Sequence, residues 1–253
     1  MTYSQWRSSS TIPNIEMREY ERTKKLSELI TGKSIALVCP SPHLIGIGGG
    51  SLIESYDIAC RAGNLRFNSA EQSCDYGKRT DILIHSFNNL EISEAKRNLD
   101  FVDSSKYVLC PMVSTNFINE HEDFFDLLRQ RGNEVENVSD NVLFHEYQKV
   151  GTICNVGFAG LLILLKYDIK EVYLTGMSFY NMGKFGKVYS PEYYDMVTQG
   201  IKVCDANEEK ETSHEQARSD IHNQFAQIEY LRKLVASDPR IKLDSYLQNN
   251  LWF

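Results

Sequence analysis

The sequence of 253 residues lacks the features that mark membrane, secreted and nucleic-acid-binding proteins. Its longest apolar stretch, Val156–Leu165, is far too short to span a bilayer. The polar segment Met1–Pro13 has no apolar core of a signal peptide. Lysine and arginine form no long run and the net charge is −7, which argues against a nucleic-acid partner. We therefore expect a soluble, cytoplasmic protein without a transmembrane segment, for which peripheral membrane contact stays open.

Signals for disulfides and metal sites are also missing. The six cysteines form no C-x-x-C pair, and the histidines show no metal-ligand spacing. We interpret the cysteines as reduced thiols of the core. The sequence therefore predicts no metal site and no bound cofactor.

What is present is an alternation of short apolar runs with amphipathic segments. The runs Ser34–Cys39 and Glu171–Thr175 are typical of buried parallel strands. Further strands are expected at 56–61, 81–85, 107–110, 141–144 and 242–246, and helices at 15–30, 51–55, 91–99, 119–131, 157–167 and 220–236. This alternation predicts an α/β fold: one Rossmann-like domain over residues 1–253, with a mostly parallel sheet and helices on both faces. The irregular stretch at about 181–213 is interpreted as a mobile lid or insertion.

In a sheet of this kind, ligands bind at the carboxyl ends of the strands. Polar residues follow several of the predicted strands and are the first site candidates: Ser41, Arg61, Asn64, Ser86 and Asn88. The glycine-rich stretch Gly46–Gly50 could bring backbone N–H groups to a phosphate. It fits neither the dinucleotide pattern, since Ser51 stands where the third glycine belongs, nor the P-loop pattern. A plain surface loop is therefore the alternative there.

Two later segments place groups for an anion at the same edge. Asn155 can cap a helix whose early Gly157 leaves N–H groups free for a phosphate. Gly176 ends a strand, and the hydroxyls of Tyr180 and Tyr189 could hydrogen-bond a phosphate or a sugar. A capped core helix without ligand, and simple aromatic packing, are the alternatives.

Two histidines near the last helix are candidates for a general base. His222 falls at the start of that helix, and His214 is its rival. An imidazole can accept a proton near neutral pH. A surface histidine, or a core histidine with its hydrogen bonds made, is the alternative for either one.

Three blocks of the chain together resemble the sialyltransferases. Gly32–Pro42 with Leu52–Arg61 resembles the large sialylmotif of glycosyltransferase family 29. Asn155–Gly157 with Tyr173–Gly176 resembles the small sialylmotif, and is closer to the bacterial family 42. His222–Gln227 resembles the family 29 His-x-x-x-x-Glu motif, with Gln227 in the glutamate place. The Gly-Asn turn of the large motif is replaced by Cys39 and Pro40.

The resemblance implies a variant of the GT-A fold and an inverting, metal-independent glycosyltransferase. Its donor would be a CMP-activated acidic sugar, of the sialic acid or Kdo type, and its acceptor a glycan. The resemblance assigns the base role to His222 or His214, and donor or nucleotide contacts to Ser41, Arg61, Asn64, Ser86, Asn88, Asn155, Gly157, Gly176, Tyr180 and Tyr189. No two aspartates lie two residues apart, so the Asp-x-Asp motif that holds a metal in many nucleotide-diphosphate glycosyltransferases is absent.

Two other functions stay open at this point. A nucleotide-binding, catalytically inactive relative of the sialyltransferases fits the same motifs. A Rossmann oxidoreductase needs an acidic residue about twenty residues after its glycines, and Glu54 and Asp57 come too early for that.

Overall fold

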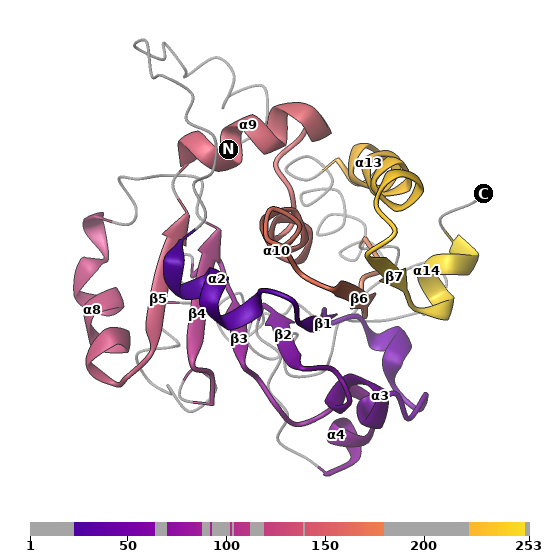
Figure 1. The fold of residues 1–253 in the computed structure, drawn as a ribbon, viewed down its shortest axis with the longest axis horizontal. Helices are drawn as coiled ribbons and strands as arrows, with labels where there is room; N and C mark the ends of the chain where they lie inside the picture. The colour runs from indigo at the N-terminus through magenta and orange to yellow at the C-terminus, as the bar shows by residue number, and fades with distance from the viewer. Residues whose placement is uncertain are drawn as a thin grey trace, which may run out of the picture.

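The computed structural model describes residues 23–63, 70–87, 92, 102, 104–111, 119–138, 140–179 and 223–250. One sheet of seven strands, in the order β5-β4-β3-β2-β1-β6-β7, runs through this part of the chain (Figure 1). The strands are β1 (Ser34–Val38), β2 (Ile58–Ala62), β3 (Ile82–Ile84), β4 (Tyr107–Pro111), β5 (Glu134–Val138), β6 (Glu171–Thr175) and β7 (Ile241–Leu243). All six pairings are parallel, so the predicted Rossmann-like α/β fold is confirmed.

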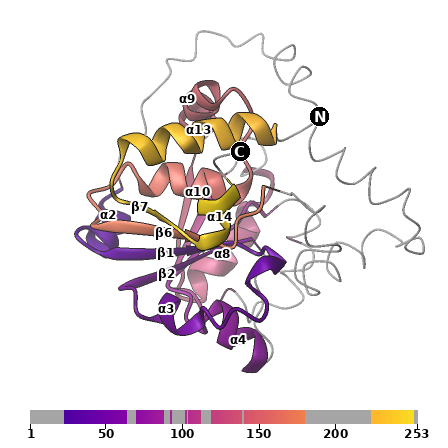
Figure 2. The ribbon, with the colours of Figure 1, turned by 90° about the vertical axis from the view of Figure 1, so that its right-hand side faces the viewer.

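Helices connect these strands and cover both faces of the sheet. They are α2 (Lys24–Ile30), the 3-10 turn η1 (Pro42–Leu44), α3 (Gly50–Glu54), α4 (Ala70–Tyr76), α8 (Glu122–Gln130), α9 (Asp140–Val150), α10 (Val156–Leu164), α13 (Gln224–Ser237) and α14 (Ser245–Asn250). Seen edge-on, α9, α10 and α13 lie on one side of the sheet and α3, α4 and α8 on the other (Figure 2).

The strand order places a switch point between β1 and β6. On one side of β1, the strands β2, β3, β4 and β5 follow one another in chain order. The next strand, β6, pairs with the other side of β1. The connections from β1 and β6 therefore lead away in opposite directions. In open parallel sheets this arrangement leaves a crevice at the carboxyl ends of the two strands, where ligands bind.

Side-chain alternation along the strands divides the core into two layers. In β1, Ile35 and Leu37 belong to the large cluster around α10, whereas Ala36 and Val38 pack with Leu44 and other residues on the α3 side. A third cluster packs α8 on β3 and β4. Because successive side chains of a strand point to opposite faces, a strand buried on both sides is apolar on both faces, as β1 is from Ile35 to Val38.

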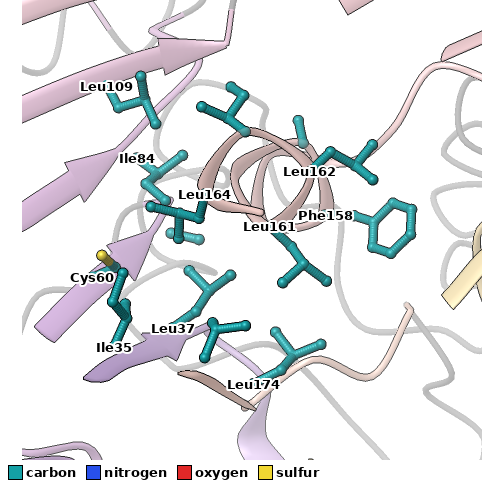
Figure 3. Close-up of a cluster of buried hydrophobic side chains, with 14 of the residues drawn as sticks. Ile35, Leu37, Cys60, Ile84, Leu109, Phe158, Leu161, Leu162, Leu164 and Leu174 are labelled. Carbon is teal, nitrogen blue, oxygen red and sulfur yellow. The ribbon is translucent and has the colours of Figure 1, made fainter. Parts of the chain in front are cut away.

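Helix α10 is the centre of the larger layer (Figure 3). Eight of its nine residues are buried, including Phe158, Leu161 and Leu164. A helix that is apolar on every side is buried on every side, and each fully buried leucine contributes about 1.5–3 kcal/mol. No helix in the described ranges is long and apolar enough to cross a membrane.

The edge of the sheet differs from the prediction. The segment 141–144, expected as a strand, is the first part of α9, in which Leu143, Tyr147 and Val150 are buried at helical spacing. The actual edge strand is β5, which was not predicted because only Val138 of its five residues is buried. The short strand expected at 242–246 is β7, which ends at Leu243 and is followed by α14.

The cysteines fit the prediction of reduced thiols with one difference. Cys39, Cys60, Cys110 and Cys154 are buried and free, and Cys74 is free but exposed. Burial raises the pKa of each of the four core thiols, so they stay protonated at neutral pH. Cys204 lies outside the described residues, as do the predicted helix at 91–99, apart from Ile92, and the predicted lid at 181–213.

Candidate functional site at the carboxyl edge of the sheet

The first turn of α10 sits directly on the ends of three strands. A Cβ atom at Gly157 would lie 2.6 Å from Sγ of Cys39, 3.1 Å from Cε of Met177 and 3.4 Å from Cβ of Ala62. Cys39 directly follows β1, Met177 lies just after β6, and Ala62 is the last residue of β2. Glycine at position 157 therefore lets the first turn of α10 pack closely on the carboxyl ends of these strands.

Asn155 is the N-cap of α10, as predicted. Its Oδ1 accepts a hydrogen bond of 2.9 Å from the N–H of Phe158, and its carbonyl accepts the N–H of Ala159. Inside the helix, the N–H groups of Val156 and Gly157 have no carbonyl to bond. The positive end of the helix dipole therefore lies at the carboxyl ends of β1 and β6, where it favours an anion.

The start of α13 is fastened to the loop that leads into α10. The N–H of Asn223 donates to Oγ1 of Thr152 over 2.9 Å, and the N–H of Asn155 donates to Oε1 of Gln227 over 3.1 Å. Two segments about 70 residues apart thus meet at the N-terminus of α10. Sequence reasoning quoted Gln227 as part of a motif but did not place it against Asn155.

Gly176 closes the other side of the crevice. It has a φ of +71°, and a Cβ atom there would lie 2.1 Å from the carbonyl oxygen of Cys39. Its own carbonyl accepts the N–H of Ser41 over 2.9 Å. The segments that follow β1 and β6 are therefore in direct backbone contact, which only glycine permits at this position.

Asp244, which directly follows β7, stabilises the contact between the segments that follow β1 and β6. Its Oδ2 accepts hydrogen bonds from Oγ1 of Thr175 (2.9 Å), the N–H of Gly176 (3.0 Å) and Nε2 of His43 (3.0 Å). Its Oδ1 accepts the N–H of Leu247 (2.8 Å) and so caps α14. Burial would raise the pKa of Asp244, but the bonds from His43 and from these N–H groups outweigh it and hold the pKa below the usual value.

Ser41, His43 and Asp244 form a buried relay that sequence reasoning missed. Nδ1 of His43 lies 2.9 Å from Oγ of Ser41, and its ring stacks on Tyr246 at 4.2 Å. Because Nε2 faces a carboxylate, it carries the proton, and in the neutral ring Nδ1 accepts from Ser41. Only 1% of Ser41 is exposed, and its contact with His43 holds the loop after β1 in place.

A small cavity lies beside this relay, on the α3 side of the sheet. Its volume is about 50 Å³, and its lining includes His43, Tyr173, Thr175, Asp244 and Tyr246. That is room for a few water molecules and far less than the several hundred Å³ of a typical ligand pocket. The cavity therefore does not hold a nucleotide sugar.

The glycine-rich loop after β1 binds the side-chain carboxylate of Asp75. The N–H groups of Gly46 and Gly48 donate to the two carboxylate oxygens of Asp75 over 2.8 and 2.7 Å. At Gly50, a Cβ atom would lie 2.3 Å from the carbonyl oxygen of Ser73, so glycine lets α3 approach α4 closely. These glycines build the α3–α4 side of the fold, and their N–H groups do not point to a free phosphate site.

Arg61, predicted on the donor side, points away from the crevice. Ala62 faces Gly157, so its neighbour Arg61 faces the opposite side of the sheet. There its guanidinium donates to the carbonyls of Arg79 (2.9 Å) and Tyr76 (2.8 Å). Burial lowers the pKa of Arg61 to about 10, so it stays charged at neutral pH. In this structure Arg61 fixes the turn before β3.

The structure thus gathers four of the predicted residues around the end of β1: Ser41, Asn155, Gly157 and Gly176. Ser86 follows β3 at the same edge of the sheet, two strands away from β1. His214, His222, Tyr180, Tyr189, Asn64 and Asn88 lie outside the described residues, so their roles stay predictions. In the described ranges, no group of three His, Cys, Asp or Glu side chains could hold a metal ion.

Neither a protein-family model nor a curated protein matches the sequence. Among solved structures, the chain is similar to the sialyltransferase CstII from Campylobacter jejuni in complex with the substrate analogue CMP-3FNeuAc. The TM-score is 0.53 at 13% identity, over 86% of this chain and 84% of that one. For CstII with cytidine-5'-monophosphate, the TM-score is 0.50 at 14% identity, over 87% of this chain and 84% of that one. For a CstII variant in complex with CMP, the TM-score is 0.51 at 13% identity, over 86% of this chain and 84% of that one.

At this level of identity the likeness establishes the fold. The predicted resemblance to bacterial sialyltransferases is therefore supported as a resemblance in structure. None of these matches supports the resemblance to family 29.

Proposed function

We propose that this protein is a glycosyltransferase that moves an acidic sugar, of the sialic acid or Kdo type, from a CMP-sugar to a glycan acceptor. One observation carries the proposal: the open N-terminus of α10 meets the β1/β6 switch point, with Asn155 and Gly157 on one side and Gly176 on the other. Such a site suits a single phosphate. The likeness in fold to CstII bound to CMP supports a cytidine nucleotide as the ligand.

In the proposed reaction, the acceptor hydroxyl oxygen attacks the anomeric carbon of the donor sugar. The bond from that carbon to the phosphate oxygen breaks, CMP leaves with the bonding electrons, and the configuration inverts. The hydroxyl proton passes to a base, with His222 as the first candidate and His214 as the second. Tyr180 and Tyr189 are proposed to donate hydrogen bonds to the departing phosphate, beside the N–H groups at the start of α10.

The proposed reaction is independent of a metal ion. A nucleotide monophosphate leaving group carries less charge than a diphosphate, and N–H donors with the helix dipole can stabilise it. We expect the same rate of CMP release in EDTA as in magnesium chloride. A rate that collapses in EDTA and returns with magnesium would contradict this part of the proposal.

The experiment that tests the function is incubation of the protein with CMP-sialic acid and with CMP-Kdo, with CMP release followed by chromatography. Turnover of either donor supports the proposal, including slow hydrolysis without an acceptor. Calorimetric CMP binding without any turnover would favour the nucleotide-binding, inactive alternative. Absence of both would overturn the proposed function.

The base is tested by replacing each late histidine. We expect His222→Ala to lower CMP release by about a hundredfold or more while CMP binding is kept, because a general base contributes about 10²–10⁴ in rate. His121→Ala, at the start of α8 on the other side of the sheet, is the matched control and should keep full activity. Full activity in His222→Ala would transfer the role to His214, which the variant His214→Ala then tests.

A further inference from the structure

Gln227 is a polar residue in a buried position of α13. Of the fourteen residues in this helix, only Gln227 and Leu231 are fully buried, one turn apart on the face toward the core. The exposed fraction of Gln227 is 0%. A buried amide costs free energy unless its hydrogen bonds are made, so an apolar side chain is the expected residue here.

Only one half of this amide is bonded. Oε1 accepts the N–H of Asn155 over 3.1 Å. Nε2 has no hydrogen-bond partner in the structure as described. The orientation of the amide is fixed by chemistry, because the N–H of Asn155 is a donor and requires an oxygen opposite it. Nε2 is therefore a buried donor without an acceptor in the part of the chain that the structure describes.

This donor lies at the N-terminus of α10. Asn155 is the N-cap residue, and the two N–H groups that follow it are free within the helix. The bond from Asn223 to Thr152 holds the start of α13 against the same loop. Nε2 of Gln227 therefore lies beside Asn155 at the start of α10, and no acceptor for it is found among the described residues.

We propose that Nε2 of Gln227 donates a hydrogen bond to a phosphate oxygen of the nucleotide bound at the start of α10. This inference rests on the proposed function and names a further binding residue for it. A phosphate is the ligand group that fits, because the helix dipole, the free N–H groups of the first turn and the amide donor beside Asn155 all favour an anion with several acceptor oxygens. The free donor is then satisfied only in the complex.

The test is Gln227→Glu, which keeps an oxygen for Asn155 and replaces the donor with a negative oxygen. We expect CMP affinity, measured by titration calorimetry, to fall about tenfold to a hundredfold, the range for one hydrogen bond to a charged group. Affinity for cytidine, which has no phosphate, should change by less than about twofold when measured by ligand-detected NMR. A general structural defect would weaken both ligands alike.

Two further variants control for the added charge and for loss of folding. Gln224→Glu makes the same chemical change three residues earlier in α13, where the side chain is only partly buried, and should bind CMP as the wild type does. Gln227→Met removes the donor without adding charge, and should also weaken CMP binding more than cytidine binding if the glutamate variant does not fold.

The outcomes separate this inference from the function on which it rests. Wild-type affinity for CMP in both Gln227 variants overturns the role of Gln227 and leaves the proposed function standing. An equal loss for CMP and cytidine, or an equal loss in Gln224→Glu, overturns the phosphate contact. A wild-type protein that does not bind CMP at all overturns the inference together with the proposed function.

Discussion

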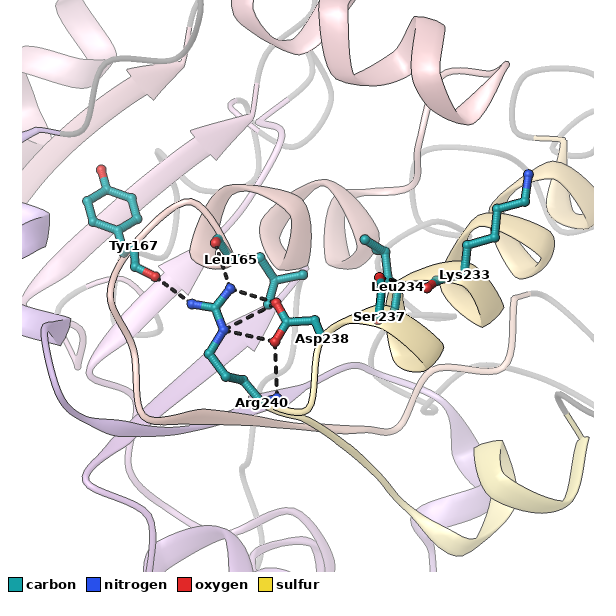
Figure 4. A network of polar contacts seen from close by, with 7 residues as sticks. All are labelled: Leu165, Tyr167, Lys233, Leu234, Ser237, Asp238 and Arg240. Carbon is teal, nitrogen blue, oxygen red and sulfur yellow. Dashed lines mark hydrogen bonds and ion pairs between the residues drawn. The ribbon is translucent and has the colours of Figure 1, made fainter.

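The two ends of helix α10 are built in opposite ways. At the N-terminal end, Asn155 caps one N–H, and among the described residues two further N–H groups and the buried Nε2 of Gln227 have no acceptor. At the C-terminal end, the guanidinium of Arg240 donates to the carbonyls of Tyr167 (2.9 Å) and Leu165 (3.1 Å) (Figure 4). The same guanidinium pairs with the carboxylate of Asp238 at 2.6 Å.

The difference separates binding from stability. The cation of Arg240 lies at the negative pole of the helix, where it is favourable. The carbonyls of Leu161, Ile163 and Leu164 accept the backbone N–H groups of residues 165–167. The positive pole has no such partner among the described residues. We call the C-terminal end, which Arg240 covers, the closed end, and the N-terminal end at Asn155 the open end. We infer that the closed end stabilises the fold, whereas the open end binds the proposed ligand.

The largest expected effect comes from a pair of glycines with the same backbone, one at each edge of the sheet. Gly176 at the carboxyl edge and Gly32 at the amino edge both have φ near +70°, but only Gly176 is in close contact with another backbone, at Cys39. We expect Gly176→Ala to lower the free energy of unfolding by more than about 3 kcal/mol, because strain and a backbone clash add.

Gly32→Ala is the matched control, since no atom of the described ranges lies within 4 Å of its added Cβ. It should cost about 1–2 kcal/mol, the cost of a left-handed conformation alone. Urea denaturation followed by circular dichroism measures both. Equal losses in the two variants would show that the contact with Cys39 is not tight.

Next in size is the closed end of α10. Arg240→Ala should lower the free energy of unfolding by about 2 kcal/mol at pH 7, because two carbonyls and Asp238 lose a charged partner. CMP affinity should be unchanged. The hydrogen bonds from Arg240 hold the pKa of Asp238 below its usual value. That part of the stabilisation is present above about pH 4 and is lost as the pH falls through the lower pKa of the folded state, so the gap between wild type and variant should narrow below about pH 4. The part that comes from the two carbonyls should remain.

The control for this variant is Arg129→Ala, which removes an exposed ion pair with Asp126 on α8. Exposed pairs contribute about 0–1 kcal/mol, so this variant should be nearly as stable as the wild type. A gap between wild type and Arg240→Ala that stays constant down to pH 2 would remove Asp238 from the explanation.

The smallest expected loss of stability is at the open end. Asn155→Ala removes the N-cap and should cost about 1 kcal/mol. It should also weaken CMP binding about threefold, because the first turn of α10 loses its fixed geometry and part of its favourable dipole. The comparison with Arg240→Ala is decisive: Asn155→Ala loses less stability but more affinity. The reverse order would contradict the division between the two ends.

Much of the fold could be predicted because it depends on local patterns. In β1 the run Ile35–Val38 is apolar and buried because both faces of the strand are covered, and in β6 the apolar Val172 and Leu174 are buried. Helix α10 is apolar on every side for the same reason. The edge strand β5 escaped prediction because Glu134, Glu136 and Asn137 are not buried there. Its strand conformation depends on pairing with β4, which no local pattern records.

The residues of the candidate site also divide into those with a local sequence signal and those that depend on long-range contacts. Asn155, Gly157 and Gly176 were predicted because caps and glycines leave local signals. The relay of His43 and Asp244 was missed, since its members are 201 residues apart and Asp244 was expected inside a strand. Arg61 was expected beside the donor, and the alternation of β2 turns it to the other face.

By itself, the sequence determined the parallel α/β class, the capped helix and the glycine positions, because periodicity, capping and φ preference act over a few neighbouring residues. Only the tertiary structure decided which of these groups meet: that Gln227 reaches Asn155, that Asp75 fills the glycine loop, and that Arg240 closes the far end of α10. These contacts join segments far apart in the chain, and packing alone sets their distances.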